Sequence, residues 1–171
     1  YKGFHTVRHF VDGRSMPGSG VLGVREFIQA EATGKDIART TPLEVAAMLR
    51  AHADAAVAQS GRITPGADKE LRLWLGDIAA MAYLGRYYAA KIEGAVHLAR
   101  LSRTADEADR ERAVHALAEA LQWWREYAAV AARQYKPQLL TRLGRVDVAD
   151  LTRKVEEDIG IARHWTAAEN G

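Results

Sequence analysis

Two pairs of a glutamate and a histidine are the residues of this chain whose types and spacing come nearest to a metal site. Glu93 and His97 form one pair, and Glu111 and His115 form the other, in two segments with helical periodicity. A di-iron carboxylate centre needs Glu-x-x-His on two helices and one glutamate from each of two others. Both pairs here are one residue longer, a spacing at which glutamate and histidine are neighbours on a helix surface. The sequence therefore predicts no metal centre.

His5 and His9 are a second candidate pair of metal ligands, because two histidines four residues apart can share one face of a helix. Val7 and Val11 argue against a helix at this position, and only Asp12 could complete a ligand set. Zinc sites take three or four protein ligands. We therefore expect both histidines to face solvent or a neighbouring domain.

The glycine run 18–23, Gly-Ser-Gly-Val-Leu-Gly, matches the fingerprint of dinucleotide-binding loops. That fingerprint works only between a strand and a helix of a parallel sheet. The segments that follow it all have helical periodicity, so no such sheet can form. We interpret the run as a connector and predict no cofactor.

Aromatic side chains offer a candidate binding surface in two of the helical segments. Trp124 lies on an apolar seam and is expected to pack in the core, whereas Trp123 and Tyr127 share an adjacent stripe. Tyr87 and Tyr88 complete the candidate ligand-binding set, and no residue is assigned a catalytic role. These rings could face sugars, a neighbouring domain or another helix. The basic residues nearby could orient a polar ligand or stay solvated at the edge: Arg86, Lys91 and Arg125.

Helix-start signals predict where the helices that position these residues begin. Threonine or aspartate caps stand before long segments of helical periodicity, two of them with a glutamate three residues later, as in a capping box. The four predicted starts are Thr41 with Glu44, Thr64 with Pro65, Thr104 with Glu107, and Asp147. The helices that follow are expected over residues 42–59, 65–101, 105–135 and 148–165.

Short connections between long helices favour antiparallel neighbours. We predict an all-α fold: an antiparallel up-and-down bundle of four main helices, with an irregular N-terminal arm and one short extra helix over residues 24–31. Residues 1–22 form the arm or linker, 23–166 the bundle domain and 167–171 a C-terminal tail. Inside the longest helix, three glycines are expected to lie at a close helix crossing: Gly76, Gly85 and Gly94.

Composition supports one domain with a sizeable core, since 48% of the 171 residues are hydrophobic. The 24 basic and 22 acidic residues are interspersed, which argues against a nucleic-acid partner. The absence of cysteine removes disulfides and thiolate chemistry, and no apolar run is long enough to span a membrane. Because the chain begins at Tyr1, we expect it to be a piece of a longer protein.

Four segments carry a family resemblance: residues 77–92, 122–128, 135–140 and 158–163. Together they resemble the C-terminal helical region of large secreted bacterial proteins of the glycoside-hydrolase kind, where such a region follows a catalytic barrel. The resemblance covers about half of the chain and consists of helix-packing residues. None of the family's catalytic carboxylates can be carried onto a position here.

The resemblance implies a non-catalytic accessory helical domain of a bacterial carbohydrate-active enzyme, packed against or capping the catalytic domain of the same parent chain. It further implies a secreted or periplasmic location and a polysaccharide as a second partner; the composition is also compatible with the cytoplasm. The alternative is a free-standing helical protein–protein interaction module. The two differ in what the complete gene encodes before Tyr1, where a barrel-length reading frame would favour the first.

Overall fold

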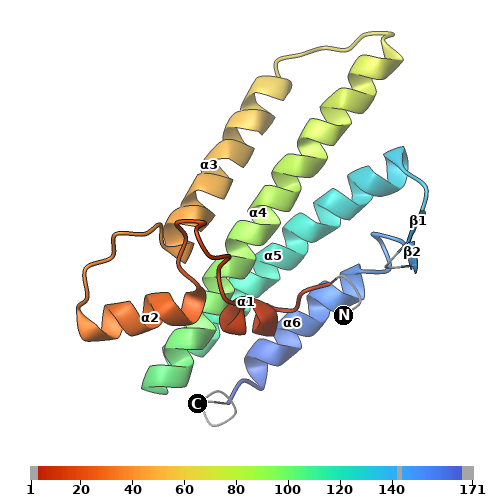
Figure 1. The fold of residues 1–171 in the computed structure, drawn as a ribbon. Helices are drawn as coiled ribbons and strands as arrows, with labels where there is room; N and C mark the ends of the chain where they lie inside the picture. The colour runs from red at the N-terminus through yellow and green to blue at the C-terminus, as the bar shows by residue number, and fades with distance from the viewer. Residues whose placement is uncertain (1–3, 142–143, 167–171) are drawn as a thin grey trace.

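The computed structural model describes residues 4–141 and 144–166, and it confirms the predicted all-α antiparallel bundle (Figure 1). Three long helices form one layer, in which α4 packs between the two others. They are α3 (Pro42–Ser60), α4 (Lys69–Thr104) and α5 (Glu107–Gln134). The predicted tail at 167–171 lies outside the described residues.

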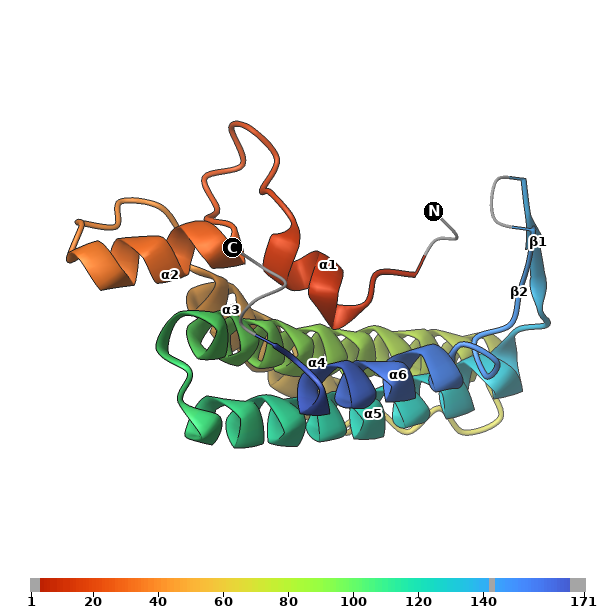
Figure 2. The same cartoon turned by 90° about the horizontal axis from the view of Figure 1, so that it is seen from below.

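Shorter elements cover only part of this layer. Helix α6 (Thr152–Arg163) packs on α5, while α1 (Val7–Asp12) and α2 (Val24–Thr33) pack on α4 (Figure 2). Between α5 and α6, the chain forms an antiparallel hairpin of β1 (Gln138–Leu140) and β2 (Gly144–Val146). The hairpin lies in the connection between the helices predicted over residues 105–135 and 148–165.

The capping box at Thr41 is confirmed at the start of α3. The Thr41 hydroxyl accepts a hydrogen bond from the Glu44 amide at 3.2 Å, and the Glu44 carboxylate accepts one from the Thr41 amide at 2.7 Å. These two bonds satisfy backbone donors that would otherwise lack a partner at the helix start. The short helix at residues 24–31 is also confirmed as α2, which ends at Gly34 in the left-handed conformation.

Aspartates cap the next two helices, and the predicted threonine starts are wrong by a few residues. Helix α4 begins after Asp68, whose carboxylate accepts from the Leu71 amide at 3.0 Å. Helix α5 begins after Asp106, whose carboxylate accepts from the Ala108 amide at 3.0 Å. An ionised carboxylate is favoured at the positive end of a helix dipole, which explains why these residues replace the threonines as caps.

Two further boundaries differ from the sequence prediction. Asp147 accepts from the Ala149 amide in a turn, and α6 itself starts only at Thr152. Within the arm, residues 7–12 are helical although the two valines argue against it. The ring of His9 returns to Thr6, accepting from its amide at 3.2 Å and contacting its hydroxyl at 2.9 Å, and so caps this short helix.

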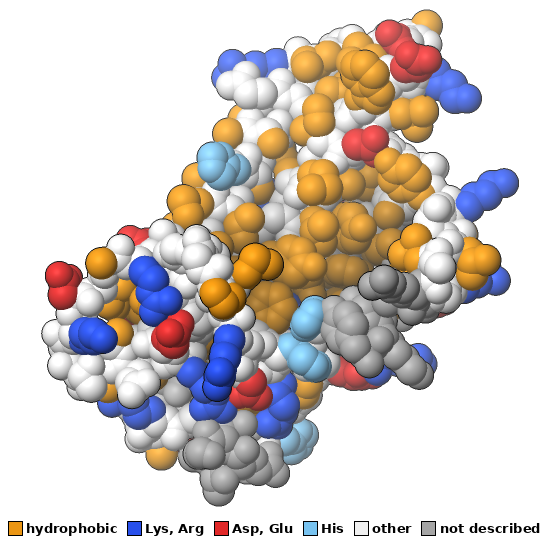
Figure 3. Space-filling view, in the orientation of Figure 1, with side chains coloured by type: hydrophobic (Ala, Val, Ile, Leu, Met, Phe, Trp, Pro, Cys, Tyr) orange, Lys and Arg blue, Asp and Glu red, His pale blue; other side chains and the backbone are white. Residues whose placement is uncertain are grey.

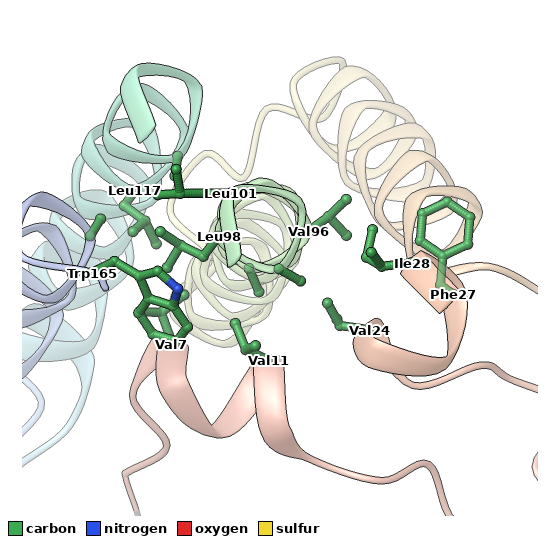
Figure 4. Packing of buried hydrophobic residues seen from close by; sticks show 14 of the residues in the cluster. Val7, Val11, Val24, Phe27, Ile28, Val96, Leu98, Leu101, Leu117 and Trp165 are labelled. Carbon is green, nitrogen blue, oxygen red and sulfur yellow. The ribbon is translucent and has the colours of Figure 1, made fainter. Parts of the chain in front are cut away.

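Buried hydrophobic residues gather in two clusters along α4. The first joins α1, α2 and the end of α6 to the C-terminal half of α4; in Figure 4, Val7 and Val11 point from α1 toward α4, and Trp165 lies beside Val7. The second cluster centres on Tyr87 and Trp124 and packs α4, α5 and α6 together. The arm therefore contributes to the same core as the bundle.

The three glycines of α4 lie at two different helix contacts. Gly94 touches α5 so closely that a Cβ atom there would lie 2.8 Å from the Leu117 Cγ atom, and Gly76 faces Gln134 of the same helix. Gly85 instead faces Leu49 and its neighbours on α3, with ordinary spacing. The expected close contact is thus found at Gly94 and Gly76, both toward α5, while Gly85 lies on the opposite side of α4.

Candidate functional site

Lys91 is the most deeply buried ionisable group on α4. Its side chain is 0% exposed, and its ammonium lies 2.8 Å from the Asp158 carboxylate of α6. It also donates hydrogen bonds to the Tyr87 hydroxyl at 2.9 Å and to the His5 carbonyl at 2.6 Å. This placement contradicts the expectation that Lys91 orients a ligand or stays solvated at an edge.

Residues of the N-terminal segment complete this cluster from outside. The ammonium of Lys91 lies 4.6 Å from the ring centroid of Phe4 and 5.2 Å from that of Phe10, both within range of a cation–π interaction. The second oxygen of Asp158 accepts from the Val7 amide at 2.7 Å. One buried ion pair therefore joins the arm, α4 and α6.

Burial dominates the electrostatics of this pair. It raises the pKa of Asp158 above the ordinary aspartate value, although the Lys91 charge and the Val7 amide act in the opposite direction. It lowers the pKa of Lys91, against the attraction of Asp158, and it raises the pKa of Tyr87. Because the charged groups are enclosed and bonded to one another, we interpret the cluster as a structural fastening of the arm.

The four aromatic residues selected from the sequence do not form one platform. Tyr87 is buried, with its ring centroid 5.1 Å from that of Trp124. Tyr127 packs edge-on against the same tryptophan at 5.3 Å, and Tyr88 is 39% exposed and stacks on Phe10 of α1.

Trp123 lies in different surroundings, among the polar contacts of α3, α4 and α5. Its ring stacks on Tyr83 at 6.0 Å, and the Arg86 guanidinium lies 4.4 Å from its centroid. Its indole donates to the Glu119 carboxylate at 3.1 Å. Ligand binding by the four selected aromatics stays a prediction, and only Tyr127 lines one of the grooves described below.

An ionic network ties together the same three helices. Arg50 of α3 bridges Glu93 of α4 and Glu119 of α5, with one contact of 2.6 Å to each. Burial raises the pKa of Glu119, but the hydrogen bonds from Arg50 and Trp123 together lower it by more than burial raises it. The pKa of Glu119 therefore lies below the usual glutamate value. Arg86 similarly pairs with Asp54 of α3.

The first of the two Glu–His pairs follows this pattern of structural pairing, and the second, Glu111 with His115, lines a groove between α4 and α5. Glu93 is held by Arg50, and the His97 ring contacts the Asp109 carboxylate at 2.8 Å. Within residues 4–141 and 144–166 there is no group of three or more histidine and acidic side chains placed to hold a metal ion.

Hydrophobic side chains gather in a hollow over the upper part of the bundle, between α3 and the end of α5 (Figure 3). One groove, which we call the α3–α4 groove, has a volume of about 400 Å³ and walls that are almost wholly apolar. Its lining residues are Leu49, His52, Ala53, Ala56, Asp77, Ile78, Met81, Ala82 and Gly85.

A second groove, which we call the hairpin groove, lies between the end of α5, the hairpin and the turn that precedes α6. Its volume is about 380 Å³, and its walls include Tyr127, Tyr135, Pro137, Leu140 and Val148. Sequence reasoning selected Tyr127 but missed the rest, because the hairpin that brings them together leaves only a short apolar pair, Leu139 and Leu140, as its signal.

No helix among the described residues is both long and apolar enough to cross a membrane. Comparisons with known protein families, with curated proteins and with solved structures find no match to this chain.

Proposed function

We propose that this chain is a non-catalytic accessory helical domain that docks on a neighbouring catalytic domain through the hairpin β1–β2 and the hairpin groove. The observation that carries the proposal is the apolar character of a hairpin that projects from the bundle (Figure 2). Leu139 at its first strand is 84% exposed, and Leu140 and Tyr135 beside it are exposed as well. Clustered apolar residues of this kind are typical of interaction sites.

The hairpin also needs support that the described contacts supply only in part. An isolated two-stranded hairpin is marginally stable in water, and three or more strands or a packed face are needed for independent stability. All three residues of β1 are exposed, as are two of the three in β2. A partner that covers Leu139 and fills the groove beside it would supply the missing packed face.

The carboxylates of the chain support a non-catalytic role. Glycoside hydrolysis uses two carboxyl groups about 5–10 Å apart across the bound sugar. The hairpin groove is lined by one acidic residue, Asp147, which accepts a backbone hydrogen bond. Two of the glutamates in the groove between α4 and α5, Glu93 and Glu119, are both engaged by Arg50. The carbohydrate-active parent is proposed on the family resemblance of the helical segments.

A site-specific crosslink tests the docking. A photoreactive phenylalanine analogue replaces Leu139 in the complete gene product, and the crosslinked peptide is identified by mass spectrometry. We expect an intramolecular crosslink to a residue before Tyr1, and none from the same analogue at Met16, which is also highly exposed. The absence of any crosslinked peptide from Leu139, or crosslinks to another protein only, would contradict docking within one parent chain. Crosslinks to another protein only would favour a free-standing interaction module.

A further inference from the structure

We infer that the α3–α4 groove is the contact surface for a second copy of this chain, in a two-fold symmetric dimer. This surface is separate from the hairpin groove, so the inference goes beyond the docking proposed above. The two share no lining residue.

Small residues make the floor of the groove, and polar atoms are scarce in it. Ala53 of α3 and Ala82 of α4 are buried there, and Gly85 meets α3 without a side chain of its own. His52 and Asp77 are the polar residues of the lining, and the Asp77 carboxylate already accepts hydrogen bonds from Gln134 and Tyr135. The groove can therefore accept large apolar side chains.

Large apolar side chains stand on the same surface. Trp74 and Met81 of α4 are each 66% exposed, with Ile78 between them. The spacing of four and three residues places all three on one face of the helix. Ile78 and Met81 also line the groove, so the protruding side chains and the recess adjoin each other.

A surface that carries both a protrusion and a recess can be complementary to itself. In a two-fold dimer the same patch is used by both copies, so each protrusion enters the recess of the partner. Trp74 and Gly85 are separated by about 16 Å along α4, at 1.5 Å per residue. An axis near Ile78 and Met81 would place each Trp74 over the Gly85 end of the other groove, where the small residues leave room.

Charge favours a second copy over a charged partner. Helix α3 has three charged residues, and each has a partner away from the groove: Glu44 caps its own helix start, Arg50 pairs with α4 and α5, and Asp54 pairs with Arg86. In the groove lining a charged partner would meet the Asp77 carboxylate, which already accepts hydrogen bonds from Gln134 and Tyr135, so it would lose hydration for little gain. A second copy of the same surface brings mainly apolar side chains to the contact.

The exposed apolar side chains on this surface account for part of the area that a dimer buries. Four large side chains on or beside the groove, Met48, Trp74, Ile78 and Met81, are between 41% and 66% exposed. At about 200 Å² for a large side chain they present roughly 400 Å², about half of the 800 Å² that each partner buries in a standard interface. The weakest specific interfaces bury about 500 Å² per partner, so a surface of this size fits a dimer of modest affinity.

Sedimentation equilibrium of the 171-residue chain tests this inference. At 1–200 µM, on the order of ordinary dimer affinities, we expect the weight-average mass to rise from 18.8 kDa toward twice that value. Met81→Glu adds a charge at an exposed position and should raise the dimer dissociation constant at least tenfold. Ala56→Phe, which fills the recess from α3, should do the same. Leu139→Glu is the matched control on the hairpin and should leave the constant unchanged.

Each outcome is decisive because circular dichroism first verifies that the variants fold. Loss of the dimer in both groove variants, with retention in Leu139→Glu, supports the inference. A wild-type chain that stays monomeric overturns it and leaves the groove to a different partner. A dimer that survives both groove variants, or that Leu139→Glu also disrupts, overturns it as well. Because the docking proposal is tested at Leu139 in the complete gene product, either proposal can fail without the other.

Discussion

Replacing Lys91 by methionine should be among the most destabilising single changes on the surface between the arm and the bundle. The substitution removes the counter-charge of a carboxylate that is 1% exposed, together with the hydrogen bonds to Tyr87 and the His5 carbonyl. Removing one partner of a buried ion pair typically costs about 3–5 kcal/mol. Among the described residues, the remaining carboxylate keeps its bond from the Val7 amide as its one hydrogen bond.

Urea unfolding followed by circular dichroism at pH 7 measures this effect. In thermal unfolding, a loss of about 1 kcal/mol in the free energy of unfolding lowers the melting temperature of a chain of this length by about 2–4 °C. We therefore expect a fall of about 10 °C for this variant. The double variant with Asp158→Leu should recover part of the free energy of unfolding, because both charges are then absent. A loss below about 1 kcal/mol for Lys91→Met, or a double variant less stable than the single one, would refute the reasoning.

Three further predictions concern the bundle. Gly94→Ala should reduce the free energy of unfolding by about 1–3 kcal/mol, because its Cβ would lie 2.8 Å from Leu117. Gly85→Ala should instead raise the free energy of unfolding by up to about 1 kcal/mol, because alanine has the higher helix propensity. Equal effects of the two substitutions in urea unfolding would contradict the assigned contacts. Trp124→Ala should reduce it by about 3–5 kcal/mol as a core truncation, and a comparable loss for the partly buried Trp123→Ala would show that this ring belongs to the packing rather than to a ligand surface. The pKa of Glu119 lies below its usual value in the folded chain, so its ionised form stabilises the fold above the ordinary glutamate pKa and this contribution is lost as the pH falls through the folded pKa. Glu119→Gln should accordingly be less stable than the wild type at pH 7, and the difference should shrink as the pH falls below the ordinary glutamate pKa; a difference that does not shrink in acid would count against an electrostatic origin.

Helix content and pairing were predictable from the sequence because the signals for them are local. The Thr41 box and the apolar seams with their three- and four-residue spacing depend on neighbours within two turns. The exact starts of α4 and α5 were less predictable, because Thr64 and Asp68, or Thr104 and Asp106, compete as caps within a few residues. The preference of a helix start for an ionised carboxylate decides between such alternatives.

The features that could not be predicted from the sequence depend on contacts between segments that are distant along the chain. Helix α1 has six residues, too few to be stable alone, and it forms because Val7 and Val11 are buried against α4. Lys91 and Asp158 are far apart in the sequence, and Asp158 follows Glu156 and Glu157 in a charged stretch. A partial signal exists for Lys91, since it falls on a stripe with Leu84 and Leu98 that is otherwise apolar.

The hairpin illustrates the same limit for the candidate site. Pro137 and Gly144 predict an interruption between helices, but nothing local specifies that the two segments pair or that Tyr135 and Val148 come to line one groove. Strand pairing of three residues on each side depends on its surroundings rather than on propensity. The proposed docking surface could therefore not be predicted from the sequence, although Tyr127 was selected as a candidate ligand-binding residue.

Hydrogen exchange of the hairpin amides is the most direct test of docking through this element. Mass spectrometry would compare peptides covering residues 138–146 in the 171-residue chain and in the complete gene product, with a peptide from the buried end of α4, residues 89–99, as the internal control. Docking predicts at least tenfold slower exchange of the hairpin in the complete product and unchanged exchange in α4. Equal exchange of the hairpin in both proteins would contradict the claim that a neighbouring domain covers it.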